Sequence, residues 1–386
     1  MRKVCVVITA RPSYSRVKSL LSALANRVDV ELQVVVAASA LIERTGRVVE
    51  LIKRDGFPVN AEVFSLVDGD SEANMARSTA LTLLELPSVF TRLQPDVVVV
   101  VADRYETIAT SIAASYMHIT VAHIQGGEVT GNIDERVRHA NTKLADLHFV
   151  ASETARRRVL LMGEDPATIH LTGCPSIDLA RDITPTTPIG FEPFAKYGGV
   201  GRPLDALDEY VVVLQHPVTN EVDDSRRQVS ATLEAICRLG MPTLWFWPNV
   251  DAGADQTSKA IRSFRETRDP KNVHFFKNME PDEFLRLINR AAVLVGNSSV
   301  GVREAGYLGV PVVNIGSRQT GRERARNVME CGYDSEDIET KIRQQIEHGR
   351  YDADSLYGDG TAGKKIAQLL ATVPLVADKR FFDGER

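Results

Sequence analysis

The chain has 386 residues, enough for two domains of ordinary size, and its 44% hydrophobic and 25% charged residues are typical of a globular protein. The formal net charge of −5 gives no electrostatic reason to expect nucleic acid or an anionic membrane as a partner, so any phosphate must be bound by local geometry. The four cysteines are scattered, without a CxxC pair or a histidine cluster, which argues against disulfides or structural zinc and favours a reducing, cytoplasmic location.

The N-terminal segment predicts a buried strand. Two basic residues precede the apolar run VCVVIT (4–9), a beginning that superficially resembles a short signal peptide. Arg11 and Pro12 end the run at once, and no small-residue cleavage site follows. No apolar stretch approaches the length that spans a membrane.

The first half alternates short apolar runs with segments of helical period. The helical segments lie at 15–27 and 104–117, and the further runs are VELQVVVAA (30–38), DVVVVVA (96–102), ITVAHI (119–124) and LHFVA (147–151). Continuous Val-rich strands separated by helices indicate a parallel sheet covered on both faces. Residues 1–181 are therefore predicted to form one doubly wound α/β domain.

Residues 182–208 are rich in proline and glycine and are interpreted as an interdomain linker. Strand-like runs then resume, with a helical segment at 281–291, and these runs lie at 210–216, 242–248, 273–276, 291–296 and 310–315. They predict a second doubly wound domain over 209–365. Two such Rossmann-like domains would face one cleft with the carboxyl ends of their sheets, where open α/β sheets bind ligands.

The segment AAVLVGNSSVGVREAGYLG (291–309) predicts a strand, a small polar turn and a helix. Gly296 and Gly301 permit a tight backbone, Asn297 can cap the helix, and Ser298 and Ser299 offer hydroxyls beside free helix N–H groups, as in phosphate sites. Glu304, further along this helix, can accept from both hydroxyls of a ribose. The alternative is an ordinary capped helix with a solvated glutamate.

Arginines follow two other predicted strands. The segment NIGSRQTGRER (314–324) brings Arg318, Arg322 and Arg324 after the strand at 310–315, and guanidinium groups suit phosphate geometry. Together with the preceding segment they favour a nucleotide site. Arg11 follows the first strand and could meet a diphosphate, although taken alone it is more typical of a surface arginine.

Ionisable side chains cluster after strands of the first domain. Asp103 follows an all-valine strand, where an unpaired carboxylate is costly unless it faces a cleft. On a helix beginning near Asp134, that residue can pair with Arg138, while Glu135 and His139 share a neighbouring face. The acids at the helix start could equally serve the helix dipole.

Two post-strand segments of the second domain carry further candidates. His216 comes directly after a strand and before Pro217, where an imidazolium can support a departing phosphate. Asn249 and Asp251 follow the next strand and are interpreted as supporting residues.

These motifs resemble one family, the hydrolysing UDP-N-acetylglucosamine 2-epimerases of bacterial sialic-acid biosynthesis. The resemblance runs in order from about residue 4 to 360, and its segments are HIQGGEVTGNIDERVRHANTKLADLHF, TGCPSIDLA, LQHPVT, FWPNVDAG, GNSSVGVREAG and NIGSRQTGRE. It implies the glycosyltransferase-B architecture of two Rossmann-like domains, with residues 366–386 packing back on the first domain. It also implies a homodimer or homotetramer, a small-molecule UDP-sugar as the partner, and neither a metal nor a cofactor.

Family roles carry over residue by residue. The resemblance makes Ser298, Ser299 and Glu304 the UDP-binding segment, with Arg11 and Arg318 at the diphosphate. Arg138, Asn249 and Arg322 are further candidates for binding the substrate. Asp103, Asp134, Glu135 and His216 match positions of the chemistry. Gln125 departs from the family: many members have HIEGGE where this chain has HIQGGE, so an amide replaces a proposed acid/base glutamate.

The resemblance implies conversion of UDP-N-acetylglucosamine to N-acetylmannosamine and UDP by elimination and hydration. In this interpretation Gln125 positions the substrate and Asp103 or Glu135 moves the proton. Three alternatives stay open: the same chemistry on UDP-N,N′-diacetylbacillosamine, a transferase of the same fold, and a non-catalytic UDP-sugar-binding protein, which stays open because of Gln125.

Overall fold

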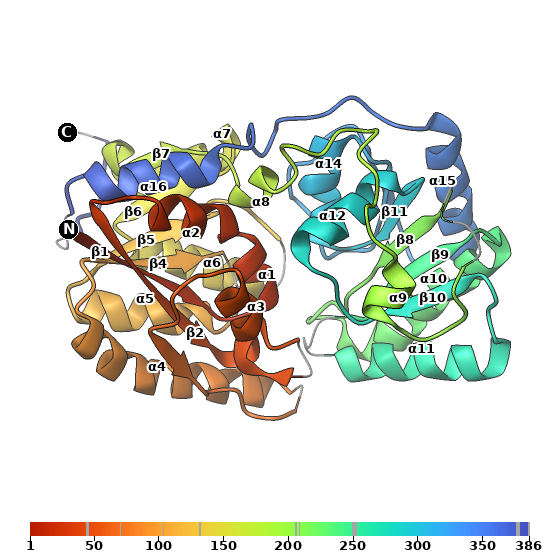
Figure 1. Cartoon of the computed structure of the whole chain (residues 1–386), viewed down its shortest axis with the longest axis horizontal. Coiled ribbons are helices and arrows are strands. Elements are labelled where there is room, and N and C mark those ends of the chain that lie inside the picture. The colour runs from red at the N-terminus through yellow and green to blue at the C-terminus, as the bar shows by residue number, and fades with distance from the viewer. Residues whose placement is uncertain are drawn as a thin grey trace. The chain divides into compact units, whose positions relative to one another are not determined.

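The computed structural model describes residues 1–43, 46–69, 71–102, 104–130, 133–204, 207, 209–248, 253–375 and 379–384. The chain divides into two compact units (Figure 1). Unit 1 comprises Met1–Val129, Ile133–Asp178 and Tyr357–Arg386, and unit 2 comprises Leu179–Leu356 with the short piece Thr130–Asn132. Both units are parallel-sheet α/β domains, as the sequence predicts.

In the described part of unit 1, seven strands form a parallel sheet in the order β3-β2-β1-β4-β5-β6-β7. The strands are β1 (Arg2–Ile8), β2 (Val30–Ala37), β3 (Ala61–Val63), β4 (Val97–Val101), β5 (Thr120–Ile124), β6 (Leu147–Val150) and β7 (Ile169–Leu171). The helices are α1 (Arg11–Ser15), α2 (Lys18–Ala25), α3 (Val48–Arg54), α4 (Glu72–Leu93), α5 (Thr107–Tyr116), α6 (Ile133–Leu144), α7 (Glu153–Leu161), α8 (Pro175–Asp178) and α16 (Ala362–Thr372), with 3₁₀ turns at Ala38–Leu41 and Pro166–Thr168.

The described part of unit 2 contains a six-stranded parallel sheet in the order β10-β9-β8-β11-β12-β13. Its strands are β8 (Val211–Leu214), β9 (Thr243–Phe246), β10 (Val273–Phe276), β11 (Val293–Gly296), β12 (Val312–Ile315) and β13 (Val328–Cys331). Its helices are α9 (Pro193–Tyr197), α10 (Ser225–Leu239), α11 (Ala254–Arg268), α12 (Pro281–Arg290), α13 (Ser299–Val302), α14 (Glu304–Leu308) and α15 (Ser335–His348), with a 3₁₀ turn at Val222–Asp224.

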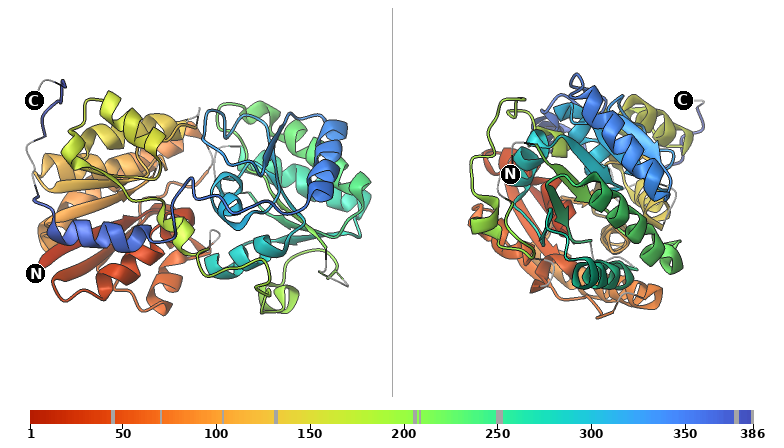
Figure 2. Two further views of the ribbon diagram at one scale, coloured as in Figure 1. Left: turned by 90° about the horizontal axis from the view of Figure 1, so that it is seen from above. Right: turned by 90° about the vertical axis from the view of Figure 1, so that its right-hand side faces the viewer.

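Successive side chains along a strand point to opposite faces of the sheet, so each sheet has a hydrophobic core on each of its two faces. In β1, Val4, Val6 and Ile8 join the core covered by α2, α3 and α16, whereas Cys5 and Val7 join the core covered by α4 and α5. Figures 1 and 2 show these helices on the two faces of the unit 1 sheet. The unit 2 sheet is covered in the same way, by α10, α11 and α15 on one face and by α12 and α14 on the other. No helix in the described ranges is long and apolar enough to cross a membrane.

The segment predicted to be a linker, 182–208, is instead folded onto unit 2 where it is described. Phe194 packs edge-on against His274, with ring centroids 4.8 Å apart, and Val200 pairs with Phe275 in an isolated antiparallel bridge. Lys196 also forms an ion pair with Glu283 at 2.7 Å. Apolar side chains among the prolines and glycines account for this docking, because they complete the core on one face of the unit 2 sheet.

The C-terminal part of the chain returns to unit 1 at Tyr357, before the predicted position 366. Helix α16 then lies beside α2 (Figures 1 and 2). Asp178 holds the start of α16 through both carboxylate oxygens, which accept from the N–H groups of Ala362 at 2.9 Å and Gly363 at 2.6 Å. A Cβ at Gly363 would lie 2.5 Å from Ser19 Oγ, so the close contact between the two helices requires glycine there.

The strand order reverses once in each sheet, between β1 and β4 in unit 1 and between β8 and β11 in unit 2. Ligands of open α/β sheets bind beyond the carboxyl ends of the strands at such points. Arg11 follows β1, and His216 and Ser298 follow β8 and β11, so these predicted site residues lie at the reversal points.

Candidate functional site

The carboxyl ends of β8 and β11 abut at the reversal point of unit 2. Gly296, the last residue of β11, has φ of +131°, and a Cβ added there would lie 2.3 Å from the carbonyl oxygen of Leu214. A side chain at this position would therefore separate the two strand ends, which explains physically why a glycine is needed there.

Asn297 joins the segments that follow these two strands. Its Oδ1 accepts from the backbone N–H of His216 at 2.8 Å, and its Nδ2 donates to the His216 carbonyl at 2.8 Å. Its own carbonyl accepts from Gln319 Nε2 at 2.8 Å and from Arg318 Nη1 at 3.2 Å. The expectation that Asn297 caps the next helix is wrong, because its side chain is engaged by His216. Three loops of unit 2 are thus tied to one asparagine.

The predicted helix after β11 is interrupted. Ser298 is the N-cap of α13, and its hydroxyl accepts from the N–H of Val300 at 3.4 Å. Helix α13 ends at Val302, Arg303 has φ of −109° and ψ of −82°, and α14 starts at Glu304. Glu304 therefore begins a second short helix instead of continuing the first. Its side chain is 8% exposed, and its Oε2 has no hydrogen-bond partner within the described part of the chain.

The arginine-rich loop after β12 is organised around Gln319. Arg322 Nη1 donates to Gln319 Oε1 at 3.1 Å, and Arg324 Nη2 donates to the Gln319 carbonyl at 3.1 Å. Arg324 also forms an ion pair with Glu330. Arg318 and Arg322 thus remain beside the strand ends, while Arg324 is directed toward β13.

Glu221 supports the beginning of the same loop. Its carboxylate accepts from Ser317 Oγ, from Gln228 Nε2 at 2.6 Å and from Tyr333 Oη at 3.4 Å. Burial, together with the nearby Glu221 charge, raises the pKa of Tyr333 to about 12, so the phenol stays protonated. Gly316 has φ of +74° and packs directly on the Tyr333 hydroxyl. The loop after β12 is therefore oriented by Glu221, which precedes α10, and by Tyr333, which follows β13.

In unit 1, two neighbouring strands end in left-handed residues that are not glycine. Ala102, after β4, has φ of +59°, and Gln125, after β5, has φ of +69°. The Ala102 N–H donates to the Ile124 carbonyl at 3.0 Å, and the Gln125 N–H donates to the Phe149 carbonyl at 3.0 Å. Such conformations are costly for these residue types and concentrate at functional sites.

The side chain of Gln125 is buried and held at one end. Its Nε2 donates to Cys174 Sγ at 2.8 Å, and Cys174 Sγ lies 2.9 Å from Ser176 Oγ. The amide oxygen Oε1 has no hydrogen-bond partner among the described residues. Gln125 thus presents an acceptor whose orientation is set by the segment that leads into α8. No pattern in the sequence indicated this role of Cys174.

Gly127, two residues after Gln125, must be a glycine because of its packing. It has φ of +78°, and a Cβ there would lie 2.2 Å from the carbonyl oxygen of Ala155 in α7. Glycine is therefore needed at Gly127 because the backbone of α7 approaches it closely.

Helix α6 carries the next predicted group. Asp134 and Glu135 lie in its first turn and are half-buried, and Glu135 Oε1 lies 3.5 Å from His139 Nε2. Burial, followed by the charge of Arg138, lowers the pKa of His139. Arg138 is completely buried, and its Nη1 donates to the Glu128 carbonyl at 2.9 Å. That contact stabilises the loop after Gly127, and a direct contact of Arg138 with substrate stays a prediction.

Of the remaining predicted site residues, some are described by the structure and others are not. Arg11 is the first residue of α1 and is half-buried, with Pro12 in the first turn. Ser299, the first residue of α13, is also half-buried, whereas His216 is 6% exposed. Asp103, Asn249 and Asp251 lie outside the described residues. No group of three or more His, Cys, Asp or Glu side chains in the described ranges could hold a metal ion.

Comparison with known proteins identifies a family. A family model described as UDP-N-acetylglucosamine 2-epimerase matches residues 22–371. The UDP-N,N′-diacetylbacillosamine 2-epimerase (hydrolyzing) of Legionella pneumophila is 32% identical over 375 residues, which cover 97% of each chain. The UDP-N-acetylglucosamine 2-epimerase of Neisseria meningitidis is 26% identical over 389 residues, or 99% of each chain.

Among solved structures, the Neisseria meningitidis UDP-GlcNAc 2-epimerase bound to UDP-GlcNAc superimposes with a TM-score of 0.79. The alignment covers 95% of this chain and 99% of that one at 20% identity. At that identity the likeness establishes the fold, which is the two-domain glycosyltransferase-B-like architecture that the sequence predicted.

Proposed function

Because the chain belongs to the UDP-N-acetylglucosamine 2-epimerase family, we propose that it is a hydrolysing UDP-sugar 2-epimerase that converts UDP-N-acetylglucosamine and water into N-acetylmannosamine and UDP. One observation carries this proposal: Glu304, the first residue of α14 after β11, keeps a buried carboxylate oxygen without a partner among the described residues. The two hydroxyls of a ribose supply the donors that such an oxygen needs.

The residues around Asn297 suit the leaving group. Arg318 and His216 are both bonded to Asn297, and Ser298 follows it in the chain. When the C1–O bond breaks, UDP leaves with the electron pair, and the Arg318 guanidinium, already held at Asn297, would stabilise this charge without reorganisation, with the His216 ring as a second donor. Because Asn297 is neutral, it positions these groups without adding a charge to the site.

The carboxylates of unit 1 suit the proton transfers. Departure of UDP makes C1 electron-poor and C2–H acidic, so Asp103 or Glu135 can take the C2 proton and leave a glycal. Hydration of the double bond then adds hydroxide at C1 and a proton at C2 from the opposite face, which gives N-acetylmannosamine. Gln125 cannot accept a proton at neutral pH, and its free Oε1 would orient a donor group of the sugar.

The second candidate substrate is UDP-N,N′-diacetylbacillosamine. It is favoured by the Legionella pneumophila relative, whose name gives that sugar and the hydrolysing reaction. The chemistry at C1 and C2 is the same for both substrates, which differ at C4 and C6 of the sugar. We further propose that the enzyme is a cytoplasmic homo-oligomer in sialic-acid-type sugar biosynthesis, in keeping with its four free cysteines.

The test is incubation with each UDP-sugar in D₂O, followed by NMR. The proposal expects UDP release without an acceptor and a free 2-epimeric sugar that carries deuterium at C2. Product without deuterium would exclude the elimination and hydration steps. UDP release only with an added acceptor would indicate a transferase, and tight binding without turnover of any UDP-sugar would indicate a binding protein.

The nucleotide half of the site has its own test. Glu304→Ala removes the acceptor for the ribose, and we expect the Kd for UDP to rise about 10- to 100-fold, as for a lost charged hydrogen bond. Glu347→Ala is the matched control, because Glu347 is exposed near the end of α15. Isothermal titration of UDP measures both. An unchanged Kd for Glu304→Ala would show that Glu304 does not bind the ribose, and the proposal would lose its main support.

A further inference from the structure

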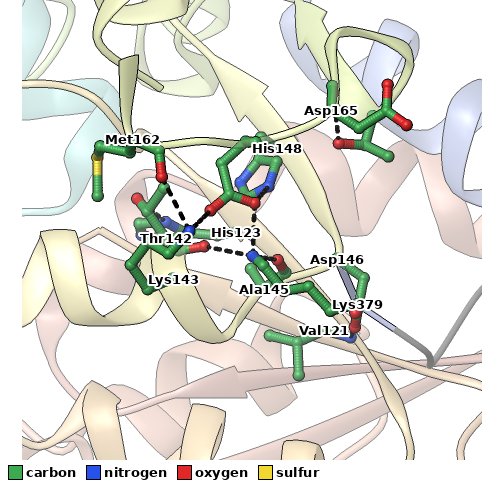
Figure 3. Close-up of polar contacts among 12 residues, drawn as sticks. Val121, His123, Thr142, Lys143, Ala145, Asp146, His148, Met162, Asp165 and Lys379 are labelled. Carbon is green, nitrogen blue, oxygen red and sulfur yellow. Dashed lines mark hydrogen bonds and ion pairs between the residues drawn. The ribbon is translucent and has the colours of Figure 1, made fainter. Parts of the chain in front are cut away.

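His123 is a completely buried histidine in β5, two residues before Gln125. Both ring nitrogens have partners: Nε2 lies 3.0 Å from the carbonyl oxygen of Ala102, and Nδ1 lies 3.2 Å from Thr142 Oγ1. Figure 3 labels His123 beside Thr142 of α6. The proposed mechanism does not use this ring, although it contacts the strand end that precedes Asp103.

These partners determine the tautomer. A carbonyl oxygen only accepts, so Nε2 carries the hydrogen and donates to Ala102, and Nδ1 accepts from the Thr142 hydroxyl. Burial lowers the pKa of His123 to about 3, so the ring is neutral under ordinary conditions. Thr142 Oγ1 also lies 3.1 Å from the Arg138 carbonyl, and its single hydrogen is shared between two acceptors.

Segments that carry all the proposed proton-transfer groups meet at this ring. Ala102 is the left-handed residue before Asp103. Gly126 follows Gln125, and a Cβ there would lie 3.1 Å from His123 Nδ1 and 2.9 Å from Thr142 Oγ1, so the QGG turn is pressed against the pair. Thr142 belongs to α6, whose first turn carries Asp134 and Glu135.

Asn141 gives the Ala102 carbonyl a second donor. Its Nδ2 lies 3.4 Å from that oxygen and 2.8 Å from Thr107 Oγ1, and its Oδ1 accepts from Ser111 Oγ at 2.7 Å. The carbonyl is therefore held between β5 and α6 by two side chains that are fixed by their own contacts. Such anchoring counteracts the tendency of a strained left-handed alanine to relax.

His148 provides a matched comparison within the same sheet. It is the register partner of His123 on β6 and is equally buried. Its Nε2 lies 3.0 Å from Glu164 Oε2, and Glu164 is also paired with Lys143 at 2.6 Å and with Lys379 at 2.5 Å. This second group attaches the C-terminal segment to the rest of unit 1. Lys379 also donates to the Thr142 carbonyl at 3.1 Å, but among the described residues no hydrogen bond or ion pair of the group involves Ala102 or Gly126.

We propose that His123 is a positioning residue for the proton transfers: by bonding the Ala102 carbonyl and supporting the QGG turn and α6, it fixes the end of β4, the turn that carries Gln125 and the helix that carries Glu135 relative to one another. The inference rests on the proposed function. A displacement of about 1 Å at such a distance from the chemistry costs about 10²-fold in rate.

The variants distinguish the two bonds of the ring. His123→Leu removes both, His123→Gln keeps a donor near the place of Nε2, and His123→Asn keeps an amide near the place of Nδ1. We expect kcat to fall about 10²-fold in His123→Leu, with KM and the Kd for UDP changed less than threefold. His123→Gln should recover more of kcat than His123→Asn, because the bond to Ala102 is the one retained. His148→Leu is the control for loss of a buried histidine.

Hydrogen exchange supplies a readout that is independent of turnover. In His123→Leu we expect faster exchange in peptides 101–107 and 125–130 than in wild type, and in His148→Leu no change there. Wild-type kcat in folded His123→Leu, or the same kcat loss in His148→Leu, would overturn the inference while the proposed function stands. If wild type turns over no UDP-sugar, the proposed function fails. The inference is then tested by exchange alone, and equal exchange rates of peptides 101–107 and 125–130 in His123→Leu and His148→Leu would overturn it.

Discussion

The buried histidine at position 123 should make unit 1 sensitive to acid. The folded pKa of His123 is about 3, against 6.5 for the unperturbed side chain. Between these values the unfolded chain binds a proton that the folded chain does not, so stability is highest above pH 6.5 and falls as the pH decreases toward 3. The slope is about 1.4 kcal/mol per pH unit for one such group.

From pH 7.5 to pH 4.5 this linkage removes about 3 kcal/mol from the free energy of unfolding of unit 1. The figure depends little on the exact folded pKa, because pH 4.5 is well above 3 and the unfolded histidine is almost fully protonated there. His123→Gln cannot titrate, so the stability difference between the two pH values should be smaller by about 3 kcal/mol in this variant. His148, whose pKa is also lowered by burial, is present in both proteins and cancels.

The assay must report on unit 1 alone. Both tryptophans, Trp245 and Trp247, belong to unit 2, so their fluorescence follows unit 2. Urea-dependent hydrogen exchange of β4 and β5, corrected for intrinsic rates, measures the stability of unit 1 at each pH. The reasoning is refuted if wild type and His123→Gln lose the same free energy between pH 7.5 and pH 4.5.

Three further changes test other contacts. Asn297→Ala removes two hydrogen bonds to the His216 backbone and should destabilise unit 2 by about 2 kcal/mol; tryptophan fluorescence in urea measures it, and an unchanged midpoint would contradict the role of Asn297. Gly127→Ala would bring a Cβ within 2.2 Å of the Ala155 carbonyl, so we expect a loss of at least about 2 kcal/mol in unit 1 by hydrogen exchange, whereas Gly56→Ala, with open space around it, should lose less. Lys379→Met removes one partner of buried Glu164, whose pKa of about 2 should rise, and we expect faster proteolysis of the C-terminal segment at pH 7; equal proteolysis rates would contradict this.

The central part of each sheet was predictable from the sequence. The runs at 4–9, 30–38, 96–102, 119–124 and 147–151 all became strands, because strands buried on both faces need continuous apolar residues. The edge strands β3, β7 and β13 were missed. Each has three or four residues, several of them exposed or half-buried, and so leaves no apolar run to recognise.

The sequence also indicated where site residues cluster, because the residues that follow parallel strands lie at one edge of a sheet. It did not predict their support. Asn297 was expected to cap a helix, yet its side chain bonds to His216, and His123 and Cys174 had no assigned role. Nor did it predict the break at Arg303 or the folding of 182–208 onto unit 2.

The sequence by itself therefore determined the parallel sheets, their succession along the chain and the positions of the polar turns, since these follow from local periodicity and from glycines needed at particular φ values. Only the tertiary structure decided which partner each polar side chain has. Asn297 and His216 are 81 residues apart, and Gln125 and Cys174 are 49 apart. Hydrogen bonds over such separations depend on which strands become neighbours in the sheet. That order depends on how whole faces of the sheet and helices are buried, and a local residue pattern does not contain this information.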